Sequence, residues 1–203
     1  MIAIFIKGGW VMFAILGVSI MAMTIIIERL LFFYRIRGND DQLISFIERC
    51  LKENDIEACL RACESEQSLL ASIIYHALKE WDAGVERLEE VFNFEGNRAI
   101  ERMEKNLRGL AVAIQGAPLL GLLGTVTGLI RAFMRVEQMS GETSVASLAG
   151  GIWEALLTTA FGLIVAIPAL FVYHMFESKV TRYANLIRDA GEKIVSLRRT
   201  VNK

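Results

Sequence analysis

Two long apolar segments in the second half of the chain constrain its fold more than any other feature. Residues 109–134 read GLAVAIQGAPLLGLLGTVTGLIRAFM, and residues 148–176 read LAGGIWEALLTTAFGLIVAIPALFVYHMF. A helix needs about 20 apolar residues to cross the hydrocarbon core of a bilayer, and both segments exceed that length. Only the polar loop 135–147 separates them, and it is too short for a domain. We therefore predict two membrane-spanning helices joined by a short loop.

A third apolar segment lies near the N-terminus, where Trp10 to Ile27 is apolar apart from two hydroxyl side chains. A signal peptide is the alternative, but it would carry its positive charge before the apolar stretch and end at a small-residue cleavage site. Here Glu28 and Arg29 follow the stretch, so we predict a retained transmembrane helix within residues 1–34. The chain is 54% hydrophobic with a mean hydropathy of +0.42, and the clustering of this content favours membrane spans over a large soluble core.

The region 35–108 is polar and shows helical periodicity. Apolar residues recur at spacings of three and four at Ile44, Ile47 and Leu51 and, after a break, at Ile56 and Leu60, and Asp55 is a candidate helix start. A long helix is predicted to run from Glu86 straight into the second span. The apolar positions of residues 177–203 fit a helix that continues out of the third span. No strand pattern competes, so the predicted fold is all-α: a polytopic membrane protein with three transmembrane helices and long helices that extend into a polar helical region.

Lysines and arginines near the span ends predict the orientation, because positive charge gathers on the cytoplasmic side. One side has Arg29, Arg35, Arg37, Arg98, Arg102, Lys105, Arg108, Lys179, Arg182 and Arg188, and the other has Lys7, Arg131 and Arg135. This bias places the C-terminus in the cytoplasm and the N-terminus outside. The predicted order is an outer N-terminus with the first span (1–34), a cytoplasmic helical region (35–108), the second span (109–134), an outer loop (135–147), the third span (148–176) and a cytoplasmic C-terminal helix (177–203).

Composition argues against several classes of function. The net charge is -1 and no basic block with interleaved aromatics occurs, which argues against nucleic-acid binding. Cys50, Cys59 and Cys63 form an odd set without a CxxC pair, which is typical of a reduced compartment and gives no disulfide framework. The two histidines, His76 and His174, have no nucleophile partner, and two thiols on one helix face lack further ligands. We therefore expect no enzyme activity, no metal site and no cofactor.

The third span carries the one acidic side chain within the predicted spans that is a candidate for ion chemistry. Glu154 and Thr158 share a helix face, and Thr159 lies at its border. A carboxylate in an apolar span costs a few kcal/mol unless it faces a pore, a partner or water. Two alternatives stay open: Glu154 lies near the outer interface and snorkels, or the threonines bond back to carbonyls of their own helix.

The second span carries small residues at helical spacing. Gly124 and Gly128 form a small-xxx-small pair, and Gly121 and Thr125 form another on the adjoining face. Helix packing is the preferred interpretation of the glycines, whereas Thr125 differs because another helix could bring it opposite Thr159. The positions predicted to pack helices or permit kinks are Pro118, Gly121, Gly124, Gly128, Gly162 and Pro168.

The segments GAPLLGLLGTVTGLIRAF (116–133) and GGIWEALLTTAFGLIVAIPALFVYH (150–174) resemble the two signature helices of the MotA/TolQ/ExbB proton-channel family, and ERL at 28–30 also fits. The three-span topology and the chain length are closer to the TolQ/ExbB branch than to the four-span motor stators. The resemblance implies a bacterial inner-membrane protein whose outer segments are periplasmic. It places Thr125, Glu154, Thr158 and Thr159 on an ion pathway, although relatives commonly have small residues at the position of Thr158.

The resemblance also implies the partners. Relatives form a ring of five around two helices of an ExbD/TolR-like single-span protein, whose membrane aspartate is protonated and released. A TonB/TolA-like protein is a further partner of such complexes, and membrane lipid surrounds them. The residues agree with this division of labour, because no aspartate lies within the three predicted spans. A membrane scaffold without ion flow, and a stator for gliding or another motility system, remain as alternatives, and the residues do not distinguish H⁺ from Na⁺.

Overall fold

The computed structural model describes residues 9–36, 38–138 and 145–201, so Lys7, Arg37 and residues 139–144 of the predicted loop 135–147 lie outside the described residues. The described residues form helices and no strand, which confirms the all-α prediction. The helices are α2 (Gly9–Arg35), α3 (Asp40–Lys52), α4 (Ile56–Ser65), α5 (Leu69–Leu78), the 3₁₀ turn η1 (Trp81–Ala83), α6 (Val85–Glu104), α7 (Leu107–Gln138) and α8 (Val145–Val201). Three stretches, containing α2, α7 and α8, are long and apolar enough to cross a membrane, as predicted.

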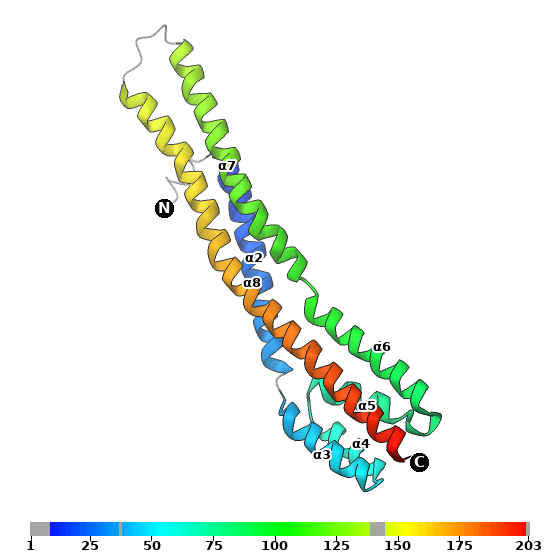
Figure 1. The fold of residues 1–203 in the computed structure, drawn as a ribbon. Coiled ribbons are helices and arrows are strands. Elements are labelled where there is room, and N and C mark those ends of the chain that lie inside the picture. Colours follow the sequence, from blue (N-terminus) through cyan, green and yellow to red (C-terminus); the bar gives the residue numbers. More distant parts are fainter. Residues whose placement is uncertain (1–8, 37, 139–144, 202–203) are drawn as a thin grey trace. The chain divides into compact units, whose positions relative to one another are not determined.

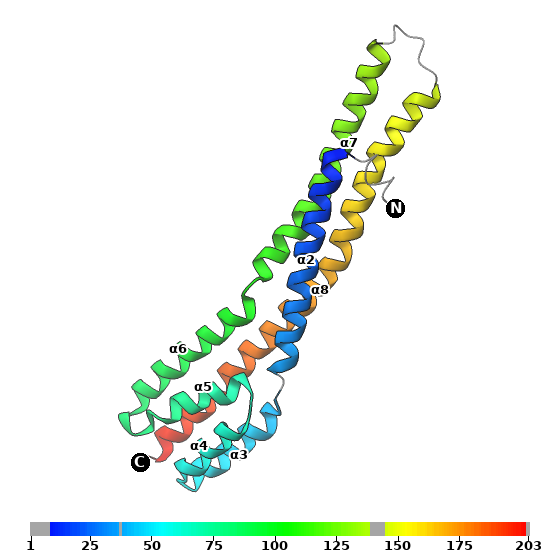
Figure 2. The same cartoon turned by 180° about the vertical axis from the view of Figure 1, so that it is seen from behind.

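The chain divides into two compact units, which we call the apolar unit (residues 1–28 and 106–175) and the polar unit (residues 29–105 and 176–203). In the apolar unit α7 and α8 lie side by side, and α2 packs over them (Figures 1 and 2). The buried side chains of Val11, Met12 and Ile15 make this contact, with Leu120, Phe161 and Val165 packed against them. Both α7 and α8 continue through their internal prolines, Pro118 and Pro168.

The large side chains of the apolar unit that do not pack between helices point outward. Examples on α7 are Val126 and Phe133, which are 48% and 59% exposed, and examples on α8 are Ile164 and Phe171, at 62% and 73%. A soluble protein rarely exposes contiguous apolar surface on this scale. Between its ends, a helix satisfies its backbone hydrogen-bonding groups internally, so such helices are suited to a hydrocarbon environment.

In the polar unit, α3, α4, α5 and α6 surround the C-terminal part of α8. The core of this unit contains Ile47, Leu51, Leu70, Ile74, Leu88, Phe92, Ile187 and Ile194, all nearly inaccessible to solvent. The predicted helix start at Asp55 is confirmed, because its carboxylate caps α4 by accepting from the Ala58 N–H. The Ser68 hydroxyl caps α5 in the same way by accepting from the Ala71 N–H.

The prediction of one continuous helix from Glu86 into the second span is wrong at a single point. Helix α6 ends at Glu104, and Asn106 adopts a left-handed backbone with φ 68° before α7 begins at Leu107. Asparagine tolerates this conformation better than most residues, so the chain can turn without glycine or proline. The Asn106 side-chain amide donates to the Glu28 carboxylate at 3.3 Å, which ties the start of α7 to α2.

Candidate functional site

The contact between α7 and α8 is built on the predicted glycines. A Cβ atom added at Gly121 would lie 2.8 Å from the Thr159 Cα, and one at Gly128 would lie 2.7 Å from the Ala155 Cβ. A Cβ at Gly124 would collide with the Thr158 side chain. The two backbones therefore approach closely because these positions carry no side chain, the geometry that small residues permit between helices in lipid.

Thr158 lies within this contact and is 1% exposed. Its hydroxyl donates to the Ala155 carbonyl at 2.7 Å, on its own helix, and lies 3.1 Å from the Gly121 carbonyl on α7. The side chain therefore joins α8 to α7.

Two threonines of α7 bond to their own helix. The Thr125 hydroxyl donates to the Leu122 carbonyl at 2.7 Å, and the Thr127 hydroxyl lies 2.9 Å from the Leu123 carbonyl. This local bonding is common for threonine in apolar helices. Both residues are only partly buried, so a lone pair on each hydroxyl oxygen is still able to accept a hydrogen bond.

Thr159 differs from the other three threonines. Its side chain is partly exposed, but its hydroxyl oxygen is buried and has no hydrogen-bond partner within the part of the chain that the structure describes. The Ala155 carbonyl, which lies four residues earlier, receives the Thr158 hydroxyl instead. A buried hydroxyl without a partner costs roughly 1–3 kcal/mol, so such a group in a native protein calls for an explanation.

Glu154 lies away from Thr159, on the wall of a cavity of about 40 Å³ formed by α2, α7 and α8. Thr127, Thr158 and the first residues of α2 line the same cavity, together with Arg131 and Arg135. This volume holds roughly three or four water molecules at about 10–15 Å³ of probe volume each. The partly buried Glu154 therefore shares this cavity with two arginine residues.

The two arginines of this cavity were not predicted as site residues. In the sequence, Arg131 and Arg135 served only as charges that mark the outer side of the membrane. Their approach to Glu154 depends on the register of α7 against α8, which the glycine contacts set. Arginine spaced 19 to 23 residues before a membrane glutamate gives no signal of its own.

Comparison with known proteins decides the family. The sequence profile described as the MotA/TolQ/ExbB proton channel family matches residues 52–189, more than half of the chain, including all of α7 and most of α8. The chain belongs to the MotA/TolQ/ExbB proton channel family. This confirms the resemblance that the two signature segments predicted.

Two ExbB-like relatives are similar to this chain over most of its length, and a TolQ protein is similar over about half of it. The putative biopolymer transport protein ExbB-like 1 of Synechocystis sp. is 33% identical over 97% of this chain and 78% of its own length. The ExbB-like 3 protein of the same organism is 30% identical over 92% of this chain and 90% of its own length. The Tol-Pal system protein TolQ of Haemophilus influenzae is 37% identical over 47% of this chain and 43% of its own. The family member is thus ExbB/TolQ-like.

Proposed function

We propose that this chain is the ring-forming inner-membrane subunit of an ion-driven stator complex that couples the proton motive force to mechanical work on envelope partners, in support of outer-membrane transport or envelope integrity. Membership of the proton channel family and the three span-length helices support this proposal. The observation that carries it is the hydroxyl of Thr159, which is desolvated and has no hydrogen-bond partner among the described residues.

The missing partner of Thr159 is proposed to come from another subunit. None of the predicted spans contains an aspartate, and the one candidate acid, Glu154, lies in the separate cavity beside Arg131. An ion relay needs a titrating group that two sides of the membrane reach in turn. An ExbD/TolR-like single-span protein would supply that aspartate, and the Thr159 hydroxyl would donate to its carboxylate. A TonB/TolA-like protein would receive the resulting movement.

Each of the other candidate residues has a different role in this proposal. Thr125 keeps a free lone pair and would help solvate the ion path. Thr158 would hold α8 against α7, because its hydroxyl lies between their carbonyls. Glu154 would contribute to the outer end of the ion path from its own cavity, and not beside the aspartate of the partner. The ring is proposed to be a pentamer, with the N-terminus outside and the C-terminus in the cytoplasm, and the protein is proposed not to be an enzyme.

A test compares Thr159→Val, which removes the hydroxyl at nearly constant shape, with Thr159→Ser, which keeps it. Each variant is co-reconstituted with the single-span partner in liposomes, and proton influx is measured under an applied potential. We expect the proton flux of Thr159→Val to be at least tenfold lower than that of the wild type. Thr159→Ser should retain most of the wild-type flux. Equal flux in the wild type and the valine variant would refute the ion-path role.

The scaffold alternative predicts a different result. A scaffold without ion flow would tolerate Thr125→Val, Thr159→Val and Glu154→Gln in every assay of partner recruitment, and the wild type would conduct no protons. The liposome flux assay therefore distinguishes an ion-conducting subunit from a scaffold without ion flow. A stator for gliding or another motility system would conduct ions as proposed but act on different envelope partners.

A further inference from the structure

Phe94 on α6 is 64% exposed to solvent. Among the described residues of 36–104 and 177–201, no other large hydrophobic side chain is exposed. Phe92, two residues earlier, is 4% exposed and belongs to the core of the polar unit. Two residues of a helix subtend about 200°, so Phe94 points away from the core and away from α8. One exposed aromatic side chain does not by itself indicate a function. The same unit also contains a groove whose character matches that of an aromatic side chain.

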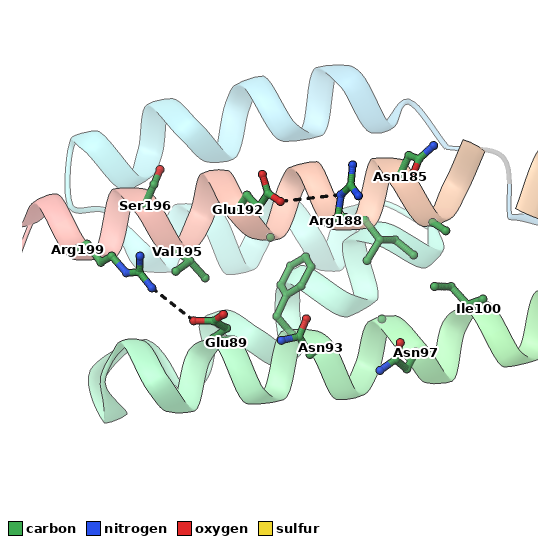
Figure 3. Close-up of a pocket in the computed structure, with 15 residues that line it drawn as sticks. Glu89, Asn93, Asn97, Ile100, Asn185, Arg188, Glu192, Val195, Ser196 and Arg199 are labelled. Atoms are coloured by element: carbon green, nitrogen blue, oxygen red, sulfur yellow. Dashed lines mark ion pairs between the residues drawn. The ribbon is translucent and has the colours of Figure 1, made fainter. Parts of the chain in front are cut away.

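The groove lies between α6 and α8 and has a volume of about 610 Å³ (Figure 3). Its floor is apolar and includes Phe92, Ile187 and Val195. The helices come together there because Phe92 packs over Gly191 and Ile187 packs over Gly96. The volume falls within the range of about 300–1,000 Å³ that is typical of ligand pockets, so a large side chain with part of its backbone would fit.

The charges on the groove are already paired. Glu89 on α6 lies 3.6 Å from Arg199 on α8, and Arg188 lies 3.9 Å from Glu192 along α8 (Figure 3). The remaining polar groups include the amides of Asn93, Asn97 and Asn185. A rim with matched charges does not favour a strongly charged ligand, whereas an apolar floor edged by amides suits an aromatic side chain and the peptide groups beside it.

The surface around Phe94 has the same character. Within about two helical turns to either side, Arg98 lies 3.9 Å from Glu95, and Glu90 lies 2.8 Å from Arg87. The aromatic ring therefore projects from a helix face whose own charges are also matched. An uncharged aromatic projection and a groove with an apolar floor and paired charges at its rim, both on one unit, are complementary in polarity.

We propose that Phe94 of one copy of this chain seats in the α6–α8 groove of a second copy. Phe94 points away from α8, so it does not reach the groove of its own chain. The contact joins two different surfaces and is therefore heterologous, and repetition of such a contact closes a ring when the rotation allows it. This inference rests on the proposed ring-forming function and names the surfaces that assemble the polar units.

The test places the photo-reactive amino acid p-benzoylphenylalanine at position 94 of the full chain, co-expressed in cells with an epitope-tagged wild-type copy. After irradiation, we expect adducts between the two copies that map to the peptides 89–100 or 184–199. The same amino acid at Lys52, an exposed position at the end of α3, should give no such adduct. Adducts from position 94 on another protein, on lipid alone or on a different face of this chain would overturn the proposal.

A second measurement covers the case in which the bulky probe disturbs assembly. Native mass spectrometry of the purified chain should show that Phe94→Ser shifts most of the ring to smaller species, whereas Phe94→Leu preserves it. Asn97→Trp, which fills the groove, should mimic Phe94→Ser, and circular dichroism should show all three folded. An intact ring in Phe94→Ser and Asn97→Trp would refute the contact. Neither readout involves ion flow, so a failure here is distinct from a failure of the Thr159 test.

Discussion

The guanidinium group of Arg29 is buried against the last turn of α6, where it lies 2.9 Å from the carbonyl of Arg102 and 3.2 Å from that of Met103. The residue is 2% exposed, and its guanidinium also stacks on the Phe32 ring at 4.6 Å. The last carbonyls of a helix have no partner within the helix, and a cation there also interacts favourably with the helix dipole. Arg29 thus satisfies the end of α6 where the chain turns.

We expect Arg29→Met to destabilise the protein by about 3 kcal/mol, since hydrogen bonds from a charged donor contribute roughly 1.5–3 kcal/mol and the carbonyls would be left buried. The stability of Arg29→Lys should lie between those of the wild type and Arg29→Met, because an ammonium group keeps the charge but lacks the planar, forked donor geometry of a guanidinium group. Unfolding of the purified protein in detergent measures both. Arg35→Met, at an exposed position of the same helix, is the control and should change little. Equal stability of Arg29→Met and the control would contradict the capping role.

Substitution by alanine should change the stability of the protein differently at two glycines of α7. A Cβ at Gly124 would collide with Thr158, whereas one at Gly116 would meet nothing within 4 Å. Gly124→Ala should therefore destabilise by about 1–3 kcal/mol through overpacking, while Gly116→Ala should be neutral or slightly stabilising because alanine favours helix. Thermal unfolding in the same detergent compares them. A tolerated Gly124→Ala would mean that α7 and α8 are further apart than described.

The difference between these two glycines shows what the sequence could predict. The spacing of small residues identified a packing face on α7, and the apolar lengths and the Asp55 start identified most helices. The partners across the contact depend on the register of α7 against α8, which no local pattern specifies. The approach of Arg131 to the cavity of Glu154 depends on that same register.

The break at Asn106 was missed for a different reason. Residues 104–107 contain neither glycine nor proline, and every residue there is compatible with a helix. The left-handed turn at Asn106 is supported by the distant Glu28 carboxylate. Local propensity was therefore overridden by a tertiary contact, which a single sequence does not reveal.

The cysteines should be chemically inert in the folded protein. Burial raises the pKa of the Cys59 and Cys63 thiols to about 12, and Cys50, also buried, lies beside Cys59. At pH 7.5 the thiolate fraction of such thiols is below about one in ten thousand, so alkylation is very slow. Mass spectrometry after iodoacetamide treatment should find all three unmodified until denaturant is added. Ser72→Cys, at an exposed position, should react at once, and rapid labelling of native Cys59 would refute the burial.

Tyr183 on α8 should make stability depend on pH in the alkaline range. Its hydroxyl donates to the Asp40 carboxylate at 2.6 Å, and burial followed by this hydrogen bond raises its pKa well above the ordinary value of 10.0. The folded state therefore retains the proton that the unfolded state loses, and the stabilisation present below pH 10 is lost progressively as the pH rises further. Denaturation between pH 8 and 11 should show a decline in wild-type stability that is shallower in Tyr183→Phe. Parallel pH profiles for the two proteins would show that Tyr183 titrates normally and is not held by Asp40.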